Sequence, residues 1–267
     1  VGTHLIDGRD RLLPFLDADL SAALEAAMRR LGVRFAWGES VEACDAPAAG
    51  DVRLRLSSGR ALATDHVLIC AGRESRAADL DPGAAGLEVA GKGRLAVDEH
   101  FRTGVPHIYA VGDVIGFPAL ASTSAEQGRA AAGHAFGEPP AAPVAPVLPT
   151  GIYTIPEVSA AGATEAELRE RGVDYLVGRA TFSDVARGKI IGDDTGFLKL
   201  LFRRRDRQLL GAHVIGEAAS EVVHIGVMTL MVGAGADLLL RTCFNHPTLG
   251  ELYKLATHDA LLRGRAG

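Results

Sequence analysis

A short apolar run that ends in Gly-Asp and leads into a long helix constrains the fold of this chain more than any other feature. Residues 108–114 have the sequence Ile-Tyr-Ala-Val-Gly-Asp-Val, which predicts a strand that ends at Gly112 and Asp113. An alanine-rich stretch from about Ala119 to Phe136 predicts a helix directly afterwards. This order brings a carboxylate and a helix N-terminus to the carboxyl edge of a sheet, where nucleotide cofactors bind. Gly-Asp is also a common turn pair, so capping a turn is the alternative role for Asp113.

The bulk composition indicates an ordinary globular chain. Its 267 residues, 48% hydrophobic and 23% charged, suffice for one large domain or two ordinary ones. A formal net charge of −5 argues against a surface for nucleic acid or another polyanion. The basic run Arg203–Arg207 stands between two strand-like runs and is predicted to be a solvated turn. No stretch reaches about 18 uninterrupted apolar residues, so we expect neither a membrane span nor a membrane partner.

The cysteines and the first residue bear on location and completeness. Cys44, Cys70 and Cys243 are scattered, with neither a C-x-x-C pair nor metal-ligand spacing, so no metal site is predicted. An odd number of scattered thiols suits a reducing compartment, and we expect a cytoplasmic protein. The sequence opens at Val1 inside a strand-like run. We therefore interpret it as the C-terminal part of a longer protein and leave a targeting segment open.

The first 75 residues alternate strand and helix patterns. Apolar residues recur at helical spacing from Asp17 to Leu31, and strand-like runs flank this helix at residues 3–6 and 33–36. An alternating run at 52–56 predicts the first strand of a hairpin, and the continuous apolar run Val67–Cys70 predicts a buried strand. This order predicts the rear half of an NAD(P)-binding domain.

The rest of the chain is predicted to form two further parts. Residues 76–140 contain the Gly-Asp run and its helix, and they end within the Pro-rich linker 137–146. Residues 141–267 begin with strand-like runs and finish with helices, which is an α+β layout. Thr164-Glu-Ala-Glu167 is a capping box that opens a short helix there. The strands are expected at 151–155, 175–182, 196–203 and 208–215, and the later helices at about 218–232, 237–242 and 248–262.

The run from Tyr109 to Ser122 resembles the second FAD-binding signature of the pyridine nucleotide-disulfide oxidoreductases, flavoproteins with two dinucleotide-binding domains. The part that follows is similar to that family's interface domain. The resemblance implies an α/β dinucleotide-binding fold (two-domain flavoprotein, Rossmann-like) followed by an α+β dimerisation domain. It also implies FAD, NADP and NAD as cofactors and a homodimer through the C-terminal domain. The G-x-G-x-x-G turns that the family needs for both dinucleotides are absent from this sequence.

The resemblance assigns the flavin to the Gly-Asp run. It implies that Asp113, directly after Gly112, accepts a hydrogen bond from a ribityl hydroxyl of FAD. It also implies that backbone N–H groups of the next helix point at the pyrimidine edge of the isoalloxazine. These N–H groups would come from around Leu120, Ala121 and Ser122. A helix N-terminus stabilises the negative charge of reduced flavin by roughly 0.3–2 kcal/mol.

Two other short segments are candidates for binding the nicotinamide nucleotides. Asp7-Gly-Arg-Asp-Arg11 follows a strand, where a βαβ fold presents an acidic residue to the adenosine ribose. Asp7 would bind the 2′-hydroxyl of NAD, and Arg9 or Arg11 the 2′-phosphate of NADP. An exposed charged turn is the alternative. Gly72 corresponds to the family's Ala-Gly-Arg turn, where a glycine allows close backbone approach to a cofactor. Arg73 would contact NAD(P) or remain solvated.

The segment His246-Pro-Thr-Leu-Gly-Glu251 is similar to the His-Pro-x-x-x-Glu motif of disulfide reductases such as dihydrolipoamide dehydrogenase. The resemblance implies that His246 is an acid/base catalyst that reaches the active site of the other subunit, and that Glu251 orients its imidazole. Such chemistry needs a histidine because a proton is exchanged with a thiol near neutral pH. The alternatives are structural: Thr248 and Glu251 form a capping box by themselves, and His246 would be only an interface residue.

Further segments are similar to one branch of the family, the soluble, Si-specific pyridine nucleotide transhydrogenases, namely residues 9–13, 114–122, 150–157, 178–182 and 223–226. In that branch NADPH reduces FAD and the reduced flavin passes a hydride to NAD⁺ without a disulfide, and this is the expected activity. A dihydrolipoamide dehydrogenase- or mercuric reductase-like enzyme is the alternative, which depends on a C-x-x-x-x-C pair outside this chain. The branch has a tyrosine at the position of His246, so this departure favours disulfide chemistry. A non-catalytic dimerisation and cofactor-binding fragment is the alternative from another class.

Overall fold

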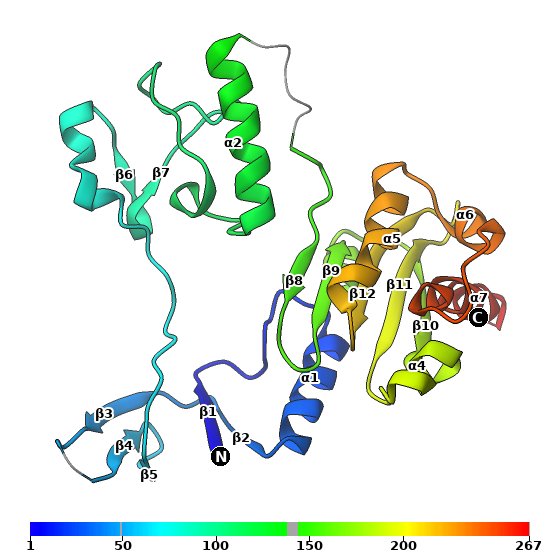
Figure 1. Ribbon diagram of the computed structural model, residues 1–267, viewed down its shortest axis with the longest axis horizontal. Coiled ribbons are helices and arrows are strands. Elements are labelled where there is room, and N and C mark those ends of the chain that lie inside the picture. The colour runs from blue at the N-terminus through cyan, green and yellow to red at the C-terminus, as the bar shows by residue number, and fades with distance from the viewer. Residues whose placement is uncertain (49, 138–143, 267) are drawn as a thin grey trace. The chain divides into compact units, whose positions relative to one another are not determined.

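The computed structural model describes residues 1–48, 50–137 and 144–266, which form two compact units (Figure 1). The first unit joins Val1–Leu68 to Val147–Gly267, and the second is Ile69–Pro146. The domain boundaries expected after residues 75 and 140 stay predictions.

The chain opens with the predicted strand, helix and strand. β1 (Thr3–Asp7) and β2 (Val33–Trp37) pair in parallel, and α1 (Ala18–Arg30) connects them. The helix forms because Leu20, Leu24 and neighbouring apolar residues share one buried face. The prediction for this part is confirmed.

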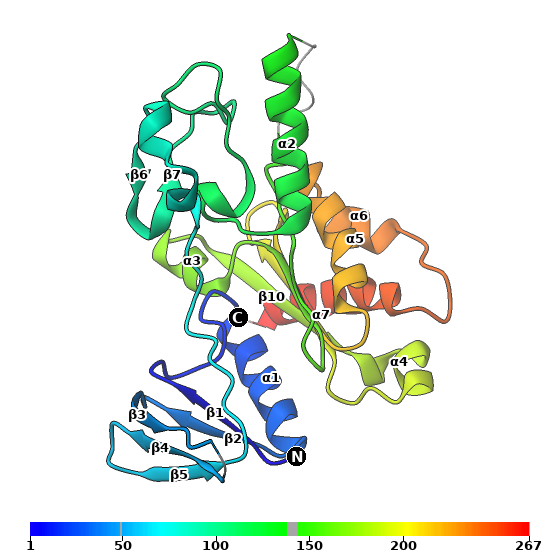
Figure 2. The same cartoon turned by 60° about the vertical axis from the view of Figure 1, so that its left-hand side comes forward.

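A small antiparallel sheet follows, formed by β3 (Val41–Asp45), β4 (Val52–Leu56) and β5 (Ala61–Thr64) (Figure 2). The predicted hairpin is confirmed as β4 and β5, with Leu54 opposite Leu62. β3 was not predicted. All five of its residues are exposed, so no alternation of buried and exposed positions marks it in the sequence.

The prediction of a buried strand at Val67–Cys70 is wrong. These residues form no strand, and the side chains of Leu68 and Ile69 are 88% and 79% exposed. A continuous apolar strand needs paired neighbours and covered faces. Among the described residues the parallel sheet contains only β1 and β2, so this run has no strand beside it.

The second unit is built mainly from turns and one long helix. The predicted helix is confirmed as α2 (Ala121–Phe136), which ends where Gly137 adopts a left-handed conformation. The strand expected to run from 108 into Gly112 and Asp113 does not form: residues 108–111 are extended and make a single bridge to residues 101–103, and Gly112–Ile115 form η4. Most of the predicted linker, residues 138–143, lies outside the described part of the chain. The short elements of this unit are η1 (Ala77–Leu80), η2 (Pro82–Ala85), β6 (Val89–Ala90), η3 (Gly91–Gly93), β7 (Arg94–Leu95) and η4 (Gly112–Ile115).

The C-terminal part contains a five-stranded antiparallel sheet in the order β10-β11-β12-β9-β8. The basic run Arg203–Arg207 lies at the turn between β11 and β12, as predicted. β9 was missed because its sequence, Val-Ser-Ala-Ala-Gly, is mostly small residues with weak strand propensity. It becomes a strand because it pairs with β12 on one side and β8 on the other. The strands are β8 (Thr150–Ile152), β9 (Val158–Gly162), β10 (Tyr175–Thr181), β11 (Phe197–Arg203) and β12 (Leu209–Ile215).

Helices cover both faces of this sheet. α5 (Ala219–Met231) and α7 (Leu252–Ala266) pack on one face and bury the main core. Gly178 of β10 permits this packing, because a Cβ there would lie 1.9 Å from the carbonyl oxygen of Ala256. α1 packs on the other face through a second apolar cluster. The remaining elements are α3 (Glu165–Glu170), η5 (Phe182–Asp184), α4 (Ala186–Ile191), α6 (Ala236–Arg241) and η6 (Leu249–Glu251).

The later helices and the capping boxes agree with the sequence analysis. The Thr164 hydroxyl accepts the N–H of Glu167, and the Glu167 carboxylate accepts the N–H of Thr164, which is the predicted capping box. α4 was not predicted, because its six residues are too short a window for helical periodicity. Among the described helices, none has the length and hydropathy needed to cross a bilayer.

Candidate functional site

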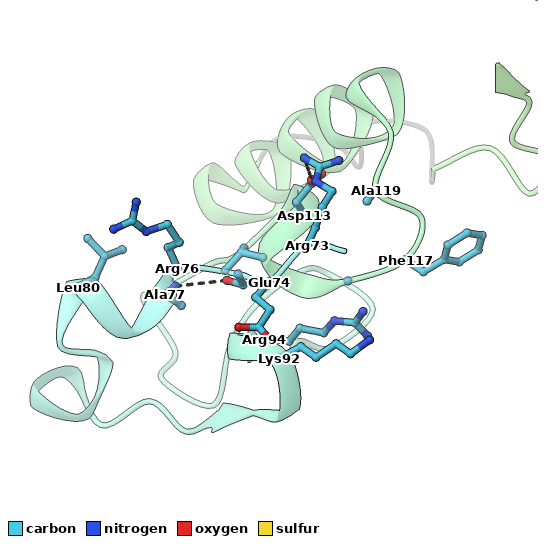
Figure 3. Close-up of a pocket in the computed structure, with 13 residues that line it drawn as sticks. Arg73, Glu74, Arg76, Ala77, Leu80, Lys92, Arg94, Asp113, Phe117 and Ala119 are labelled. Carbon is cyan, nitrogen blue, oxygen red and sulfur yellow. Dashed lines mark hydrogen bonds and ion pairs between the residues drawn. The ribbon is translucent and has the colours of Figure 1, made fainter. Parts of the chain in front are cut away.

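The second unit contains a cavity of about 510 Å³ beside the Gly-Asp run (Figure 3). This volume lies within the range of small-molecule and cofactor sites, about 300–1,000 Å³. Four basic and two acidic side chains line it, so the cavity favours an anionic ligand. Phe117 is also among the lining residues, and its ring points away from the others. The charged lining residues are Arg73, Arg76, Lys92, Arg94, Glu74 and Asp113.

The backbone at Gly112 is fixed by a buried hydrogen bond to α2. Gly112 N–H donates to the Gln127 side-chain carbonyl at 2.8 Å. The residue has a φ of +78°, which favours glycine, and a Cβ there would also crowd the Ser124 hydroxyl oxygen at 3.1 Å. Gln127 was not singled out from the sequence. The signal for it was available, because Thr123, Gln127 and Ala131 form an i, i+4 row that α2 buries.

Asp113 lies at the cavity and forms an ion pair with Arg73. The closest guanidinium nitrogen and carboxylate oxygen are 2.7 Å apart, and the Asp113 side chain is 47% exposed (Figure 3). Such exposed pairs contribute only about 0–1 kcal/mol, so the carboxylate remains available to another donor. Gly72 precedes Arg73 with a φ of +125°, and a Cβ there would meet no atom of the described residues within 4 Å. The glycine at this turn is therefore required by its backbone conformation rather than by lack of space.

The predicted N–H donors lie at the first turn of α2. Leu120 is the N-cap residue, and no described side chain caps the helix there. Ala121 and Ser122 begin the helix and are exposed. The first N–H groups of a helix have no acceptor within it and carry the positive end of its dipole. Ala119 lines the cavity, whereas the three predicted donors follow just beyond the lining.

Asp7 and Arg9, which the sequence offers as alternative nucleotide contacts, are paired with each other in the first unit. The Asp7 carboxylate accepts the Arg9 backbone N–H at 2.9 Å and the guanidinium Nε–H at 2.9 Å. The side-chain hydrogen bond from Arg9 is the main cause that lowers the pKa of Asp7 below its usual value. Arg11 instead donates to the carbonyl oxygen of Pro14 at 3.3 Å. The carboxylate is therefore ionised and already engaged by one cation.

His246 and Glu251 are also in contact, and the Glu251 carboxylate makes a hydrogen bond that suits each of its two predicted roles. Imidazole Nδ1 lies 3.0 and 3.1 Å from the two carboxylate oxygens of Glu251. The same carboxylate accepts the N–H of Thr248 at 3.1 Å and completes a capping box at η6. The hydrogen bond with His246, followed by that from Thr248, lowers the pKa of Glu251. The His246 side chain is 68% exposed, and its Nδ1 contact leaves Nε2 as the nitrogen that a substrate can reach.

The structure thus groups the predicted residues into three places. Gly72, Gly112 and Asp113 gather in the second unit with the start of α2. Asp7 with Arg9, and His246 with Glu251, form two separate pairs in the first unit. Among the described residues, no group of His, Cys, Asp and Glu side chains could hold a metal ion.

Two family models match this chain and together account for most of it. The model described as pyridine nucleotide-disulphide oxidoreductase matches residues 1–128. The model described as the dimerisation domain of the pyridine nucleotide-disulphide oxidoreductases matches residues 148–257.

Curated relatives match nearly the whole chain. A soluble pyridine nucleotide transhydrogenase from Mycobacterium bovis is 48% identical over 262 residues, which is 98% of this chain and 56% of the relative. One from Chromohalobacter salexigens is 44% identical over 266 residues, or 98% of this chain and 57% of the relative. The chain therefore spans a little over half the length of these relatives.

Solved structures show the same fold. The flavoprotein disulfide reductase RclA from Escherichia coli is similar with a TM-score of 0.88 and 25% identity, over 95% of this chain and 59% of RclA. LpdA from Mycobacterium tuberculosis is similar with a TM-score of 0.88 and 27% identity, over 97% of this chain and 56% of LpdA. These findings confirm the predicted fold class, and the chain belongs to the pyridine nucleotide-disulphide oxidoreductase family.

Proposed function

We propose that the full-length protein transfers a hydride between NADPH and NAD⁺ through bound FAD. The observation in this chain that carries the proposal is the Asp113 carboxylate at the edge of a cation-lined cavity, in the η4 turn that contacts α2. The choice of reaction is supported by the relatives named as transhydrogenases, which are 44–48% identical to almost the whole chain.

The residues of the second unit fit a dinucleotide flavin. Asp113 offers carboxylate oxygens that accept from a sugar-like hydroxyl, and its exposed partner Arg73 is displaced at little cost. Lys92 and Arg94 line the same cavity and suit phosphate oxygens. Bound FAD would supply the two-electron carrier between the two nicotinamides. The protein's own part is to hold Gly112 and Asp113 in place through Gln127.

The pair of Asp7 and Arg9 fits both nicotinamide nucleotides. With NAD, the Asp7 carboxylate accepts from a ribose hydroxyl, as βαβ folds commonly arrange. With NADP, the Arg9 guanidinium turns to the 2′-phosphate, for which its planar set of donors is well suited. The Arg9 side chain is on the surface, so it is free to change partners. A hydride transfer between NADPH and NAD⁺ requires a site that accepts both.

We also propose that the protein is a cytoplasmic homodimer through its C-terminal domain. Four large apolar side chains are exposed on or directly after α5 and α6, and such a surface needs a cover. A second copy of the chain is the cover that the matched dimerisation model supports. The four side chains are Met228, Met231, Val232 and Leu238.

The full-length protein tests these proposals in one preparation. We expect stoichiometric FAD after purification, a dimeric mass by light scattering, and reduction of thio-NAD⁺ by NADPH. The same assay without the protein gives the background rate of thio-NAD⁺ reduction by NADPH. A preparation that holds FAD and oxidises NADPH but transfers nothing to thio-NAD⁺ would contradict the proposed reaction. A protein that retains no flavin would contradict the cofactor site as well.

Disulfide reduction is a second candidate function, favoured by one observation. His246 and Glu251 are in contact at 3.0 Å, and the imidazole is exposed, as an acid/base catalyst for a thiol would need to be. The same preparation distinguishes this function, because a disulfide reductase consumes NAD(P)H when a small disulfide such as lipoamide is added. Hydride transfer to thio-NAD⁺ without any disulfide-dependent NADPH consumption would exclude it.

A further inference from the structure

Three basic side chains form a row across the C-terminal sheet, on the face opposite α5 and α7. Lys199 of β11 is the register partner of Arg179 on β10 and of His213 on β12, so the three lie side by side. Lys199 is 1% exposed and His213 is fully buried. A lysine is almost never buried to this extent without a counter-charge, so the row must be matched by acidic groups.

Those acidic groups come from two helix starts that are far apart in sequence. Lys199 Nζ lies 3.1 Å from Asp17 Oδ2 and 3.0 Å from Asp19 Oδ2, at the start of α1. It also donates to the Glu165 carboxylate at the start of α3. Asp17 Oδ1 accepts the backbone N–H of Glu165 at 2.8 Å, so the two helix starts are joined directly as well. We refer to Lys199, Asp17, Asp19 and Glu165 as the Lys199 cluster.

Neighbouring side chains form further hydrogen bonds and ion pairs with the residues of the Lys199 cluster. Arg179 pairs with Asp19, and Tyr175 donates to Glu165 at 2.8 Å. His213 donates from Nε2 to the carbonyl oxygen of Ala163 at 3.0 Å, while its Nδ1 has no partner among the described residues. Burial lowers the pKa of His213, so it stays neutral and adds no charge beside Lys199. Arg169 also pairs with Glu165 at 2.7 Å.

The Lys199 cluster holds one end of the segment that carries the nucleotide-binding candidates. Arg9 stands just after β1, and the chain then runs through residues 10–16 to Asp17. Leu12 and Leu16 in this segment are buried against Val158 and Ile215 of the C-terminal sheet. The segment is thus fixed by β1 before Arg9 and by the C-terminal sheet after it.

We propose that Lys199 is a positioning residue for the nicotinamide nucleotide. Through Asp17 and Asp19 it holds the start of α1 on the C-terminal sheet. It thereby also holds the segment that bears Asp7 and Arg9. This inference rests on the proposed role of Asp7 and Arg9. The C-terminal domain, which is not part of the nucleotide-binding fold, would thus help to set the affinity for the nucleotide. Removing the cation leaves the buried Asp17 carboxylate without its counter-charge, so the start of α1 must move toward water.

The test is Lys199→Met in the full-length, flavin-loaded protein, since methionine keeps much of the apolar stem. We expect the KM for NAD(P)(H) to rise by about tenfold, the usual scale of coupling between groups in contact, with kcat and FAD content near those of the wild type. Hydrogen exchange of backbone amides in residues 8–24 should become faster. The exchange measurement needs no nucleotide, so it tests the contact even if the proposed reaction fails.

Tyr253→Phe is the matched control for general destabilisation. Tyr253 is equally buried but faces the α5 and α7 side, where its hydroxyl accepts the Gly226 N–H at 3.0 Å. This variant should lower the melting temperature and leave the KM and the exchange of residues 8–24 unchanged. Adding Asp17→Asn to Lys199→Met should recover part of the affinity, because the amide keeps the acceptor for the Glu165 N–H without a charge.

Three outcomes would overturn the inference. The first is an equal rise of the KM in Tyr253→Phe at the same loss of melting temperature. The second is unchanged exchange of residues 8–24 in Lys199→Met. The third is faster exchange with no change in KM. If Lys199→Met does not fold, Asp19→Asn replaces it. Asp19 is partly exposed, and loss of its charge should change the KM and the hydrogen exchange in the same direction. An unchanged KM or unchanged exchange in that variant would likewise refute the proposal.

Discussion

Replacing His246 by alanine in the full-length protein separates the two candidate reactions, because only disulfide reduction needs a side-chain acid at this position. Imidazole Nδ1 is held at 3.0 and 3.1 Å from the Glu251 carboxylate oxygens, which leaves Nε2 to exchange protons. Hydride transfer from NADPH to NAD⁺ protonates no thiolate. For a transhydrogenase we therefore expect His246→Ala to stay within a few-fold of the wild-type rate.

The size of the alternative outcome follows from the same geometry. A positioned acid/base group contributes about 10²–10⁴-fold in rate, so a disulfide reductase should lose that much. Loss of stability cannot produce such an effect, because the imidazole is 68% exposed and exposed pairs contribute about 0–1 kcal/mol. Glu251→Gln should then lower the rate as well, and its melting temperature must be measured, since loss of a cap costs about 1 kcal/mol.

The assay follows reduction of thio-NAD⁺ by NADPH with flavin-loaded dimers of known FAD content. His258→Ala is the matched control, because His258 is another exposed histidine of the C-terminal region and lies on α7. We expect both variants to keep most of the wild-type rate. A hundred-fold loss of transfer to thio-NAD⁺ in folded His246→Ala, with His258→Ala unaffected, would refute the assignment to a transhydrogenase.

Three further predictions concern the flavin site and the His246 pair. Asp113→Ala should weaken FAD binding by about 1.5–3 kcal/mol, the usual contribution of a hydrogen bond to a charged group, and flavin retained after dialysis measures it. Gln127→Leu leaves the buried Gly112 N–H unpaired and should lower stability by about 1–3 kcal/mol in denaturant unfolding. The pKa of Glu251 is lowered below its usual 4.5, so the stability that it contributes is present above pH 4.5 and is lost as the pH falls through the lowered pKa. Melting curves between pH 7 and about pH 3 should show this loss in the wild type and a smaller one in Glu251→Gln.

The sequence predicts the elements whose signals are local. α1 and α2 follow from their periodicity, and the capping boxes at Thr164 and Thr248 follow from residue spacing. β9 could not be predicted, because its small residues become a strand only through pairing with β12 and β8. Val67–Cys70 misled for the opposite reason: its local pattern is that of a buried strand, and no neighbouring strand is present among the described residues.

The contacts of the candidate site also divide into those that the local sequence predicts and those that depend on the fold. The contact between His246 and Glu251 agrees with the pairing that the resemblance to the His-Pro-x-x-x-Glu motif implies. The contact between Lys199 and Asp19 joins residues 180 positions apart, and nothing in either local sequence points to the other. Gln127 is intermediate, since its buried position follows from the helical row but its acceptor role at Gly112 depends on the packing of α2.

The burial of each ion pair distinguishes the contacts that change when a cofactor binds from those that stay in place. Asp113 with Arg73, and Asp7 with Arg9, are surface pairs at the sites proposed for cofactors. Pairs of this kind contribute about 0–1 kcal/mol, so a ligand hydroxyl or phosphate exchanges with either partner at little cost. Lys199 and Asp17 are buried, and separating them would leave charges without partners at a cost of about 3–5 kcal/mol. Cofactor binding should therefore rearrange the exposed pairs and leave the start of α1 where it is. Apart from the immediate vicinity of Arg9, hydrogen exchange of the backbone amides in residues 8–24 should be the same with and without saturating NADP⁺.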